Sequence, residues 1–346
     1  MIHSMLASTQ SIGYLVSLQS EVIINTLNHN YFCAAKLDSN RTIVFNNDKI
    51  RLLTIDNNRN ITLGSWYNIV YDADNISIAT LHSTRAIIFY RGTGGGPGYS
   101  CIIDVLPNGQ LVFGTTFVVN SSNSAFASIT ALSSTRAITI SYPGVCRVID
   151  IAENGAITMG PLFNINSPAS VYYTNIEAVS STRSVIFYGT GATHGVKVID
   201  IASDRTIAFG TELTISNQSR EITECKKISP TRIIVPTLGN VIVADINLDK
   251  TITVRSNTNF IVTPEYPLAV ASFNETTSIV FYRDSNGWGV AELFNIYSDG
   301  SIARINDKIK VTSTSTHNCK ITIISETQAL LSYNANNNLK VTLLSI

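Results

Sequence analysis

Leu81-His82-Ser83-Thr84-Arg85-Ala86-Ile87-Ile88-Phe89-Tyr90 is a stretch that returns, in varied form, along the whole sequence. Its centre is a Ser-Thr-Arg turn followed by a run of apolar residues. Seven residues occupy the position of Arg85 and mark the copies: Arg41, Arg85, Arg136, Arg183, Arg232, Thr277 and Gln328. Successive copies are 44 to 51 residues apart, so the repeat covers nearly all of the 346 residues.

Each copy of the repeat divides into short apolar runs that are separated by turn residues. In the third copy the runs cover 126–132, 136–142, 146–151 and 156–160. Runs of this length predict β-strands, and the Asn-Gly between the last two predicts a hairpin. Repeats of roughly 40 to 50 residues with four strands each are typical of a β-propeller. We therefore expect an all-β fold: one domain over residues 1–346, a seven-bladed β-propeller with four antiparallel strands in each blade.

The two ends of the chain are expected to complete one blade together. A hairpin turn that starts with Asn or Asp joins the third and fourth strands of the first six repeats, whereas the seventh repeat ends after its third strand, at 340–346. Residues 1–27 precede the first repeat and contain the apolar run 12–18. A blade without its fourth strand leaves an open edge. We therefore expect residues 1–27 to supply the outer strand of the last blade and to close the ring.

Composition and charge exclude several classes of function. The chain has 24 Lys and Arg residues against 24 Asp and Glu residues, and charged residues make up only 14% of it. A neutral chain without a basic run is poorly suited to bind nucleic acid or an anionic membrane. No apolar stretch reaches the roughly 18 residues of a membrane span. His and Cys also show no metal-ligand spacing. From these observations together we expect no nucleic-acid partner, no membrane insertion, no metal and no cofactor.

The N-terminus and the cysteines bear on where the protein folds. The first ten residues have neither the basic start nor the apolar run of a signal peptide. The five cysteines stand in apolar segments, at Cys33, Cys101, Cys146, Cys225 and Cys319. This placement favours buried thiols over disulfides. We therefore expect synthesis in the cytosol without a signal peptide, and a place in the cytoplasm or in a virion or other particle.

The repeated Arg has a recurring acidic partner. An Asp stands near the end of the third strand, and the start of one strand lies opposite the end of the next in an antiparallel hairpin. The expected ion pairs are Arg85 with Asp104, Arg136 with Asp150, Arg183 with Asp200, and Arg232 with Asp245. The sixth and seventh repeats lose both partners together, and only the first repeat, with Arg41 and Thr54, breaks the rule. We interpret the pairs as structural; a ring of anion-binding arginines is the functional alternative.

The second, fourth and sixth repeats have long, glycine-rich connections between their second and third strands, at 91–99, 189–195 and 283–289. Long irregular loops on a rigid scaffold commonly carry binding residues. The candidate ligand-binding residues are Trp288, Tyr99, His194, Arg91, Arg283 and Asp284. An exposed Trp is a platform for a sugar face or an apolar side chain, and the structural alternative is packing on the neighbouring blade. The tyrosines between fourth and first strands have the same two interpretations: Tyr71, Tyr172, Tyr173 and Tyr266.

The sequence contains no catalytic constellation. The five histidines are scattered, and the glycine-rich 92–98 lacks the Lys-Ser/Thr of a phosphate-binding loop. The glutamates Glu177, Glu224, Glu265 and Glu275 show no pattern that marks paired catalytic carboxylates. We therefore expect no catalytic residue and no enzyme activity.

The repeat pattern resembles that of bacterial and phage-associated propellers, some of them lectin-like, over essentially the full length. Its elements are Leu-Ser-Xaa-Thr-Arg-Xaa-Ile-Ile-Xaa-Tyr and then Val-Ile-Asp-Ile-Xaa-Xaa-Asn-Gly. It lacks the Trp-Asp of WD40 repeats, the paired glycines of kelch repeats and the sialidase box. The resemblance implies a binding propeller for a glycan or a cell-surface receptor, as part of a virion or secreted particle. A protein–protein interaction platform in a larger assembly is the alternative, and a glycan-processing enzyme is third.

Overall fold

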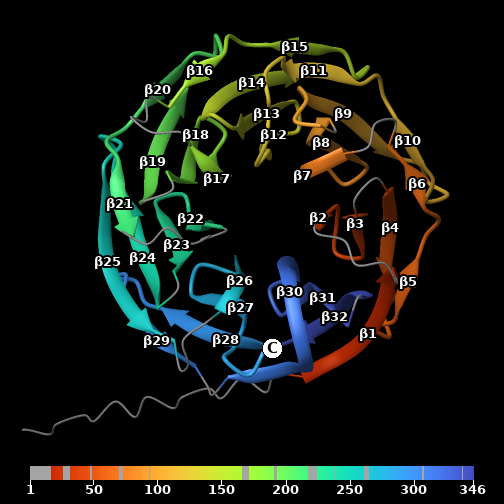
Figure 1. Ribbon diagram of the computed structural model, residues 1–346, viewed down its shortest axis with the longest axis vertical. Coiled ribbons are helices and arrows are strands. Elements are labelled where there is room, and N and C mark those ends of the chain that lie inside the picture. The colour runs from red at the N-terminus through yellow and green to blue at the C-terminus, as the bar shows by residue number, and fades with distance from the viewer. Residues whose placement is uncertain are drawn as a thin grey trace, which may run out of the picture.

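Antiparallel sheets stand around a central axis in the computed structural model of the chain (Figure 1). The structure describes residues 17–25, 32–46, 49–69, 73–92, 94–165, 171–190, 193–216, 224–237, 239–260, 265–305, 308–336 and 338–346. These residues form strands and turns, without a helix. The prediction of an all-β fold is therefore confirmed.

Four sheets share one layout, in which three long strands lie side by side and two short strands both pair with the third. The first contains β2 (Phe32–Lys36), β3 (Arg41–Asn46), β4 (Lys49–Ile55), β5 (Ile61–Leu63) and β6 (Tyr67–Asn68). The second contains β7 (Ala73–His82), β8 (Arg85–Gly92), β9 (Gly98–Val105), β10 (Leu111–Phe113) and β11 (Phe117–Asn120). The third contains β12 (Ser128–Ser133), β13 (Arg136–Ser141), β14 (Val145–Ile151), β15 (Ile157–Met159) and β16 (Phe163–Asn164). The fourth contains β17 (Tyr172–Ser180), β18 (Arg183–Gly189), β19 (His194–Ile201), β20 (Ile207–Phe209) and β21 (Leu213–Ser216).

Two further sheets depart from this layout. One has an undivided fourth strand and contains β22 (Lys226–Ser229), β23 (Arg232–Pro236), β24 (Asn240–Ile246) and β25 (Ile252–Asn259). The other joins the last two repeats, because β30 pairs with both β28 and β31. It contains β26 (Glu265–Ser272), β27 (Thr277–Arg283), β28 (Trp288–Ile296), β29 (Ile302–Arg304), β30 (Ile309–Ser325), β31 (Gln328–Ala335), β32 (Asn338–Ser345) and β1 (Ser17–Asn25). Each of the seven marker positions starts the second strand of its repeat.

The N-terminal strand β1 pairs antiparallel with β32 at the other end of the chain. The Glu21 carboxylate accepts hydrogen bonds from Tyr333 Oη and Lys340 Nζ, each at 2.7 Å. Arg51 of the first repeat donates from Nη1 to the carbonyl oxygen of Ile24 at 3.3 Å. The strand begins later than the apolar run 12–18 indicated, and residues 12–16 lie outside the described residues. Contacts on both sides thus hold β1 between the last repeat and the first.

Apolar clusters fill the space between consecutive repeats. Ile43 of the first repeat packs in one cluster with Ile88 of the second. Clusters of the same kind join each later repeat to the next. A further cluster joins the last repeat to the first and contains Ile24, Val44 and Val341. The core is therefore distributed among the junctions between sheets.

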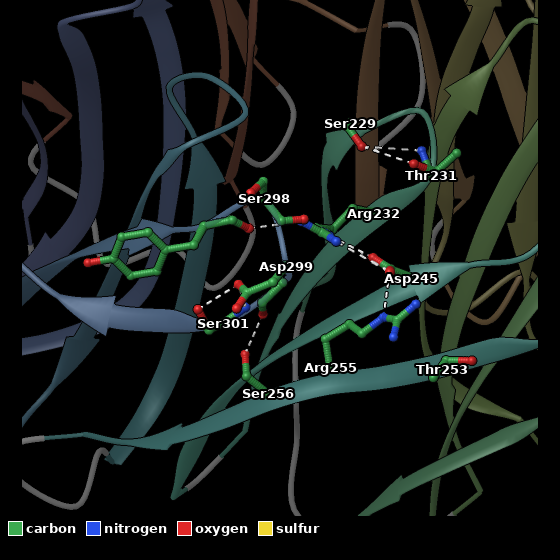
Figure 2. A network of polar contacts seen from close by, with 12 residues as sticks. Ser229, Thr231, Arg232, Asp245, Thr253, Arg255, Ser256, Ser298, Asp299 and Ser301 are labelled. Carbon is green, nitrogen blue, oxygen red and sulfur yellow. Dashed lines mark hydrogen bonds and ion pairs between the residues drawn. The ribbon is translucent and has the colours of Figure 1, made fainter.

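Arg232 shows how the repeated arginine connects its own sheet to the next (Figure 2). Its Nε and Nη2 donate to the two carboxylate oxygens of Asp245 at 2.6 and 3.3 Å. Its Nη1 donates to the carbonyl oxygens of Tyr297 and Ser298 in the sixth repeat, at 3.0 and 3.2 Å. Arg255 donates to the same carboxylate at 2.6 Å. One guanidinium therefore holds a hairpin together and connects it to the neighbouring repeat.

The same contacts recur in the second, third and fourth repeats. The distance from Arg Nε to Asp Oδ1 is 2.6 Å for Arg85–Asp104, 2.5 Å for Arg136–Asp150 and 2.6 Å for Arg183–Asp200. Each arginine also donates to backbone carbonyls in a turn of the following repeat. Arg41, which faces Thr54, pairs instead with Asp38 at 2.8 Å. Because carboxylates and carbonyls use most of the guanidinium donors, these arginines have few N–H groups left for an anion.

Small and large residues alternate where neighbouring sheets touch. A Cβ atom on Gly210 would lie 2.3 Å from the carbonyl oxygen of Lys250 in the next repeat. At the following junction the sizes are reversed, because Arg255 takes the strand position and Gly300 the turn position. A Cβ atom on Gly300 would lie 2.6 Å from the Cβ of Arg255. Each of these two junctions therefore has room for one large residue.

Candidate functional site

The predicted ligand-binding residues of loop 91–99 are half-buried against their own repeat. Arg91 donates from Nη1 to Asn123 Oδ1 at 3.4 Å. The ring of Tyr99 lies 5.8 Å from that of Tyr90, measured between centroids, and packs on the core between the first two repeats. Arg91 and Tyr99 therefore belong to the ends of β8 and β9 and pack on the scaffold.

His194 is buried, with 2% of its surface exposed, whereas the sequence placed it in a long loop. The loop is shorter than predicted because β19 already begins at this residue. The imidazole stacks on Phe187, with 5.8 Å between ring centroids and an angle of 10° between the planes. His194 is therefore a core residue in the structure.

Arg283 ends β27, Asp284 begins the tight turn that follows, and Trp288 begins β28. Asp284 is fully buried, and it accepts hydrogen bonds from the N–H of Trp288 at 3.0 Å and from Lys308 Nζ at 2.9 Å. Burial acts to raise the pKa of Asp284, but these donors outweigh it and the pKa is lowered. Trp288 is half-buried, and Lys310 Nζ lies 3.4 Å from its ring centroid. The carboxylate thus shapes the turn, Lys310 covers one face of the indole, and Arg283 is half-buried at the end of β27.

Inner strands from several repeats enclose a central cavity of about 410 Å³. Strands β2, β7, β12, β17, β22 and β30 contribute to its wall. The polar lining residues are Ser77, Thr80, Ser128, Thr130, Thr174, Asn175, Glu177, Glu224, Lys226 and Lys320. Its volume falls within the range of roughly 300 to 1,000 Å³ of small-molecule sites. This cavity, unlike the three loops, collects side chains from repeats that are far apart in the sequence.

Two ion pairs cross between repeats in the cavity. Lys226 Nζ lies 3.2 Å from Glu177 Oε2, and Lys320 Nζ lies 2.5 Å from Glu224 Oε1. The second pair connects the fifth repeat to the seventh. The cavity therefore holds two positive and two negative charges, which cancel.

The paired charges stabilise one another's ionised forms. Burial acts to raise the pKa of Glu224, but Lys320 and Lys226 outweigh it, so the pKa lies below its usual value. Burial acts to lower the pKa of Lys226, and Glu177 and Glu224 outweigh it, so this pKa is raised. Burial raises the pKa of the Cys33 thiol on the cavity wall to about 12. The cavity thus presents a carboxylate, an ammonium group and a neutral thiol at neutral pH.

Four half-buried aromatic side chains of the third and fourth repeats gather beside residues that line the cavity, since Phe126 precedes Ala127 and Tyr173 precedes Thr174. Ring centroids are 4.7 Å apart for Phe126 and Tyr173, 6.1 Å for Phe126 and Tyr172, and 5.6 Å for Tyr142 and Tyr172. Thr174, which lines the cavity, donates a hydrogen bond to the carbonyl oxygen of Phe126. We call Phe126, Tyr142, Tyr172 and Tyr173 the aromatic cluster. Its tyrosines from the connection between fourth and first strands were among the sequence candidates, whereas Tyr71 and the side chain of Tyr266 lie outside the described residues.

Two members of the aromatic cluster have a strained backbone. Phe126 has φ of 55° and Tyr173 has φ of 51°, and both stand ten residues before the marker of their repeat. In the second and seventh repeats the same position holds Asn75 and Asn318, with φ of 48° and 45°. Asn tolerates this left-handed conformation, whereas an aromatic residue is an outlier there. Strain of this kind costs about 1–3 kcal/mol and often marks functional sites.

The spacing of four charged residues from the marker is the sequence signal for the cavity. Glu177 and Lys226 each stand six residues before the marker of their repeat, and Glu224 and Lys320 each stand eight residues before theirs. Equal spacing from the marker means equal register on the inner strand, which places these residues at two levels of one axis. A charged residue at an inner-strand position that holds Ser in other repeats therefore indicates a group that faces the cavity.

The described part of the chain shows neither a metal cluster nor a membrane-spanning helix. It contains no group of three or more His, Cys, Asp or Glu side chains arranged to hold a metal ion. It also has no helix with the length and apolarity that a membrane span requires. All five cysteines are free and buried.

The similarity of this chain to known proteins lies in its fold. No protein-family model matches the sequence, and no curated protein matches it. The β-propeller domain of Cps50 (Swd1) from Myceliophteria thermophila aligns with a TM-score of 0.63 and 11% identity, over 94% of this chain and all of that domain (100%). The periplasmic gluconolactonase PpgL of Pseudomonas aeruginosa gives 0.61 and 11%, over 88% and 91%. A protein from Lactobacillus plantarum gives 0.61 and 13%, over 83% and 87%. These likenesses, together with the sheets around one axis, show that the chain is a repeat protein with a β-propeller fold.

Proposed function

We propose that the chain is a closed seven-bladed propeller and that it binds a glycan without catalysis. In this proposal β1 is the outer strand of the last blade, and the ring is a rigid support for the cavity. The contacts of Glu21 with Tyr333 and Lys340, and the cluster of Ile24 with Val44, support the closure. The glycan belongs to a cell surface or a receptor, and the propeller is part of a virion or secreted particle, as the resemblance of its repeats implies.

One observation carries the proposal of glycan binding: the aromatic cluster adjoins a neutral, polar cavity. Sugars present apolar C–H faces, which stack on aromatic rings, and hydroxyl groups, which need hydrogen-bond partners. Tyr172 and Tyr173 offer partly exposed rings, and the adjoining cavity offers hydroxyl, amide, carboxylate and ammonium groups. The strained backbone of Tyr173 supports a role for its ring beyond packing.

The electrostatics of the cavity support binding over hydrolysis. Glycosidases commonly need a carboxylic acid of raised pKa as general acid, beside a second carboxylate. In the cavity Glu224 has a lowered pKa and Glu177 is paired with Lys226. PpgL is a gluconolactonase, but its 11% identity to this chain carries a likeness in fold alone. We therefore assign no catalytic residue.

A glycan array with the purified wild-type protein tests the proposal, followed by titration of the strongest ligand. Tyr142→Ala and Tyr172→Ala are expected to weaken binding by about tenfold or more, because each removes a stacking surface. Trp288→Phe is the matched control, since this ring lies in another repeat and is covered by Lys310. Absence of glycan binding, or equal binding by all four proteins, would contradict the proposal.

A protein-interaction platform is the second candidate, and one exposed side chain favours it. Leu248 is 91% exposed in a turn whose backbone is fixed by Arg183, which donates to the Leu248 carbonyl at 3.1 Å. Single exposed apolar side chains are common on protein surfaces, so Leu248 favours this candidate only because its backbone is held in place, which lowers the entropy cost of binding. If this candidate is correct, a partner isolated in stoichiometric amounts will be lost with Leu248→Asp and retained with Tyr172→Ala. The opposite pattern would assign the partner to the aromatic cluster.

A further inference from the structure

One level of the central cavity is built from the same position of the repeats, and all residues at this position except Ala269 line it. This position lies eight residues before the marker and holds Cys33, Ser77, Ser128, Asn175, Glu224, Ala269 and Lys320. Register places these residues opposite equivalent residues of the second strand in each repeat for which the pairing is described. The side chains of Ser77, Ser128 and Asn175 share one structural task. Each accepts a hydrogen bond at 3.2 Å from the backbone N–H of the following inner strand.

Glu224 exceeds what this structural task requires. A Ser hydroxyl or an Asn amide is sufficient at the same position of three other repeats. Glu224 is 5% exposed, and its Oε2 is buried without a hydrogen bond to any described residue. The backbone N–H of Val270 also hydrogen-bonds the carboxylate and lowers its pKa, so Glu224 performs this task toward the sixth repeat and carries a negative charge in addition. A buried carboxylate oxygen without a partner is costly, so it is expected where a donor from a ligand completes it.

Lys320 supplies the complementary group. Its Nζ approaches Glu224 from the seventh repeat at 2.5 Å, past the sixth repeat, where the same position holds the small Ala269. An ammonium group has three donors, and among the described contacts Lys320 uses one of them on Glu224. The lysine side chain is 33% exposed and lines the cavity. A buried, unpartnered oxygen of Glu224 and the partly exposed ammonium group of Lys320 therefore lie side by side.

We propose that Glu224 and Lys320 bind a pair of neighbouring hydroxyl groups of a sugar inside the central cavity. In this proposal the Glu224 carboxylate turns toward the cavity so that its buried Oε2 accepts from one hydroxyl, and the same or the adjacent hydroxyl accepts from Lys320 Nζ. This inference rests on the proposed glycan function and names the part of the ligand that enters the cavity. A hydroxyl both donates and accepts, so it satisfies both groups without breaking their ion pair.

The charge balance of the cavity selects a neutral group. Glu177 with Lys226, and Glu224 with Lys320, leave no net charge. A carboxylate or phosphate on the ligand would add one uncompensated charge to a partly buried site, which is unfavourable. A neutral hydroxyl pair adds none. The aromatic cluster then stacks on the neighbouring part of the glycan.

Titration of the full-length protein with small methyl glycosides tests this inference. The probes are the methyl glycosides of glucose, galactose and mannose, and dideoxy analogues that lack one neighbouring hydroxyl pair. The proteins are the wild type, Glu224→Gln, Lys320→Met, and Tyr172→Ala for the aromatic cluster. We expect one glycoside to bind the wild type about tenfold to a hundredfold more tightly than its dideoxy analogue. Glu224→Gln and Lys320→Met should abolish this preference, whereas Tyr172→Ala should weaken both probes alike.

Two results overturn the inference, and they differ from failure of the glycan function. If the wild type binds a glycoside and its dideoxy analogue equally, the hydroxyl pair is not recognised, whatever the variants do. If a glycan from the array binds with equal affinity to the wild type, Glu224→Gln and Lys320→Met but is lost with Tyr172→Ala, the glycan function stands and the cavity site fails. Absence of every glycan and glycoside overturns both. The comparison of probes on the wild type does not depend on the folding of any variant.

Discussion

Replacing Ile24 by Ala tests whether β1 is an integral part of the ring. Ile24 is 4% exposed and packs with Val44 of the first repeat and Val341 of the last. Truncation of a buried Ile to Ala costs about 2–5 kcal/mol. Because β1 lies at the edge of its sheet and pairs with β32 alone among the described strands, it can relax, and we expect the lower half of this range, about 2–3 kcal/mol of unfolding free energy.

Ile23→Ala is the matched control for Ile24→Ala. Ile23 is the preceding residue of the same strand, but it is 48% exposed, so its truncation should change the unfolding free energy by no more than about 0.5 kcal/mol. Urea unfolding at equilibrium, followed by tryptophan fluorescence, measures both variants. Equal effects of the two substitutions, or no effect of Ile24→Ala, would refute the closure of the ring by β1.

Three further predictions concern the junctions, the ion pairs and the thiols. Gly210→Ala should lower the unfolding free energy by more than about 3 kcal/mol, because its Cβ would meet a backbone oxygen at 2.3 Å. Gly239→Ala is the control: no atom lies within 4 Å of its Cβ, so its effect in the same urea assay should be below about 1 kcal/mol. Equal effects of the two substitutions would contradict the packing. Burial acts to raise the pKa of Asp245, but Arg232 and Arg255 outweigh it, so the pKa of Asp245 is lowered in the folded protein. The Asp245 carboxylate therefore contributes to stability above the unfolded pKa of about 3.9, and this contribution is lost as the pH falls through the lower folded pKa. Asp245→Asn should therefore cost about 2–3 kcal/mol near neutral pH and flatten the acid limb of a stability-versus-pH curve, and an unchanged acid limb would exclude this carboxylate as its source. Burial raises the pKa of all five thiols, with Cys101 at about 11 and Cys33 at about 12. A thiol reagent at about pH 8 should therefore react with the cysteines only after unfolding. Rapid labelling of the folded protein would contradict the buried placement of the thiols.

Much of the scaffold could be predicted from the sequence because its determinants are local and repeated. The Ser-Thr-Arg turn fixes where each second strand begins, so Arg85 and Asp104 could be placed opposite each other from spacing alone. The strand at the N-terminus was expected from the missing seventh hairpin, although its position at Ser17–Asn25 was not. Local sequence therefore specifies the elements and their register.

The candidate site was harder to predict because it depends on packing between repeats. Asp284 and His194 stand in glycine-containing segments, which indicated open loops, yet tertiary contacts bury both. Glu224 and Lys320 are 96 residues apart and meet only because the repeats stand around one axis. Once the marker position is known, their equal spacing from it is visible in the sequence, but the ion pair between them follows only from the arrangement of the sheets.

Tyr173→Asn tests the proposed recognition site most directly, because binding is expected to fall while stability does not. Asn is the residue found at the same left-handed position as Asn75 and Asn318, so the substitution removes the aromatic ring and relieves backbone strain. The measurement is the affinity for the strongest array glycan together with the unfolding free energy of the same protein. We predict unchanged or increased stability and an affinity reduced by about tenfold or more. Full affinity in a stably folded Tyr173→Asn protein would contradict glycan recognition by the aromatic cluster.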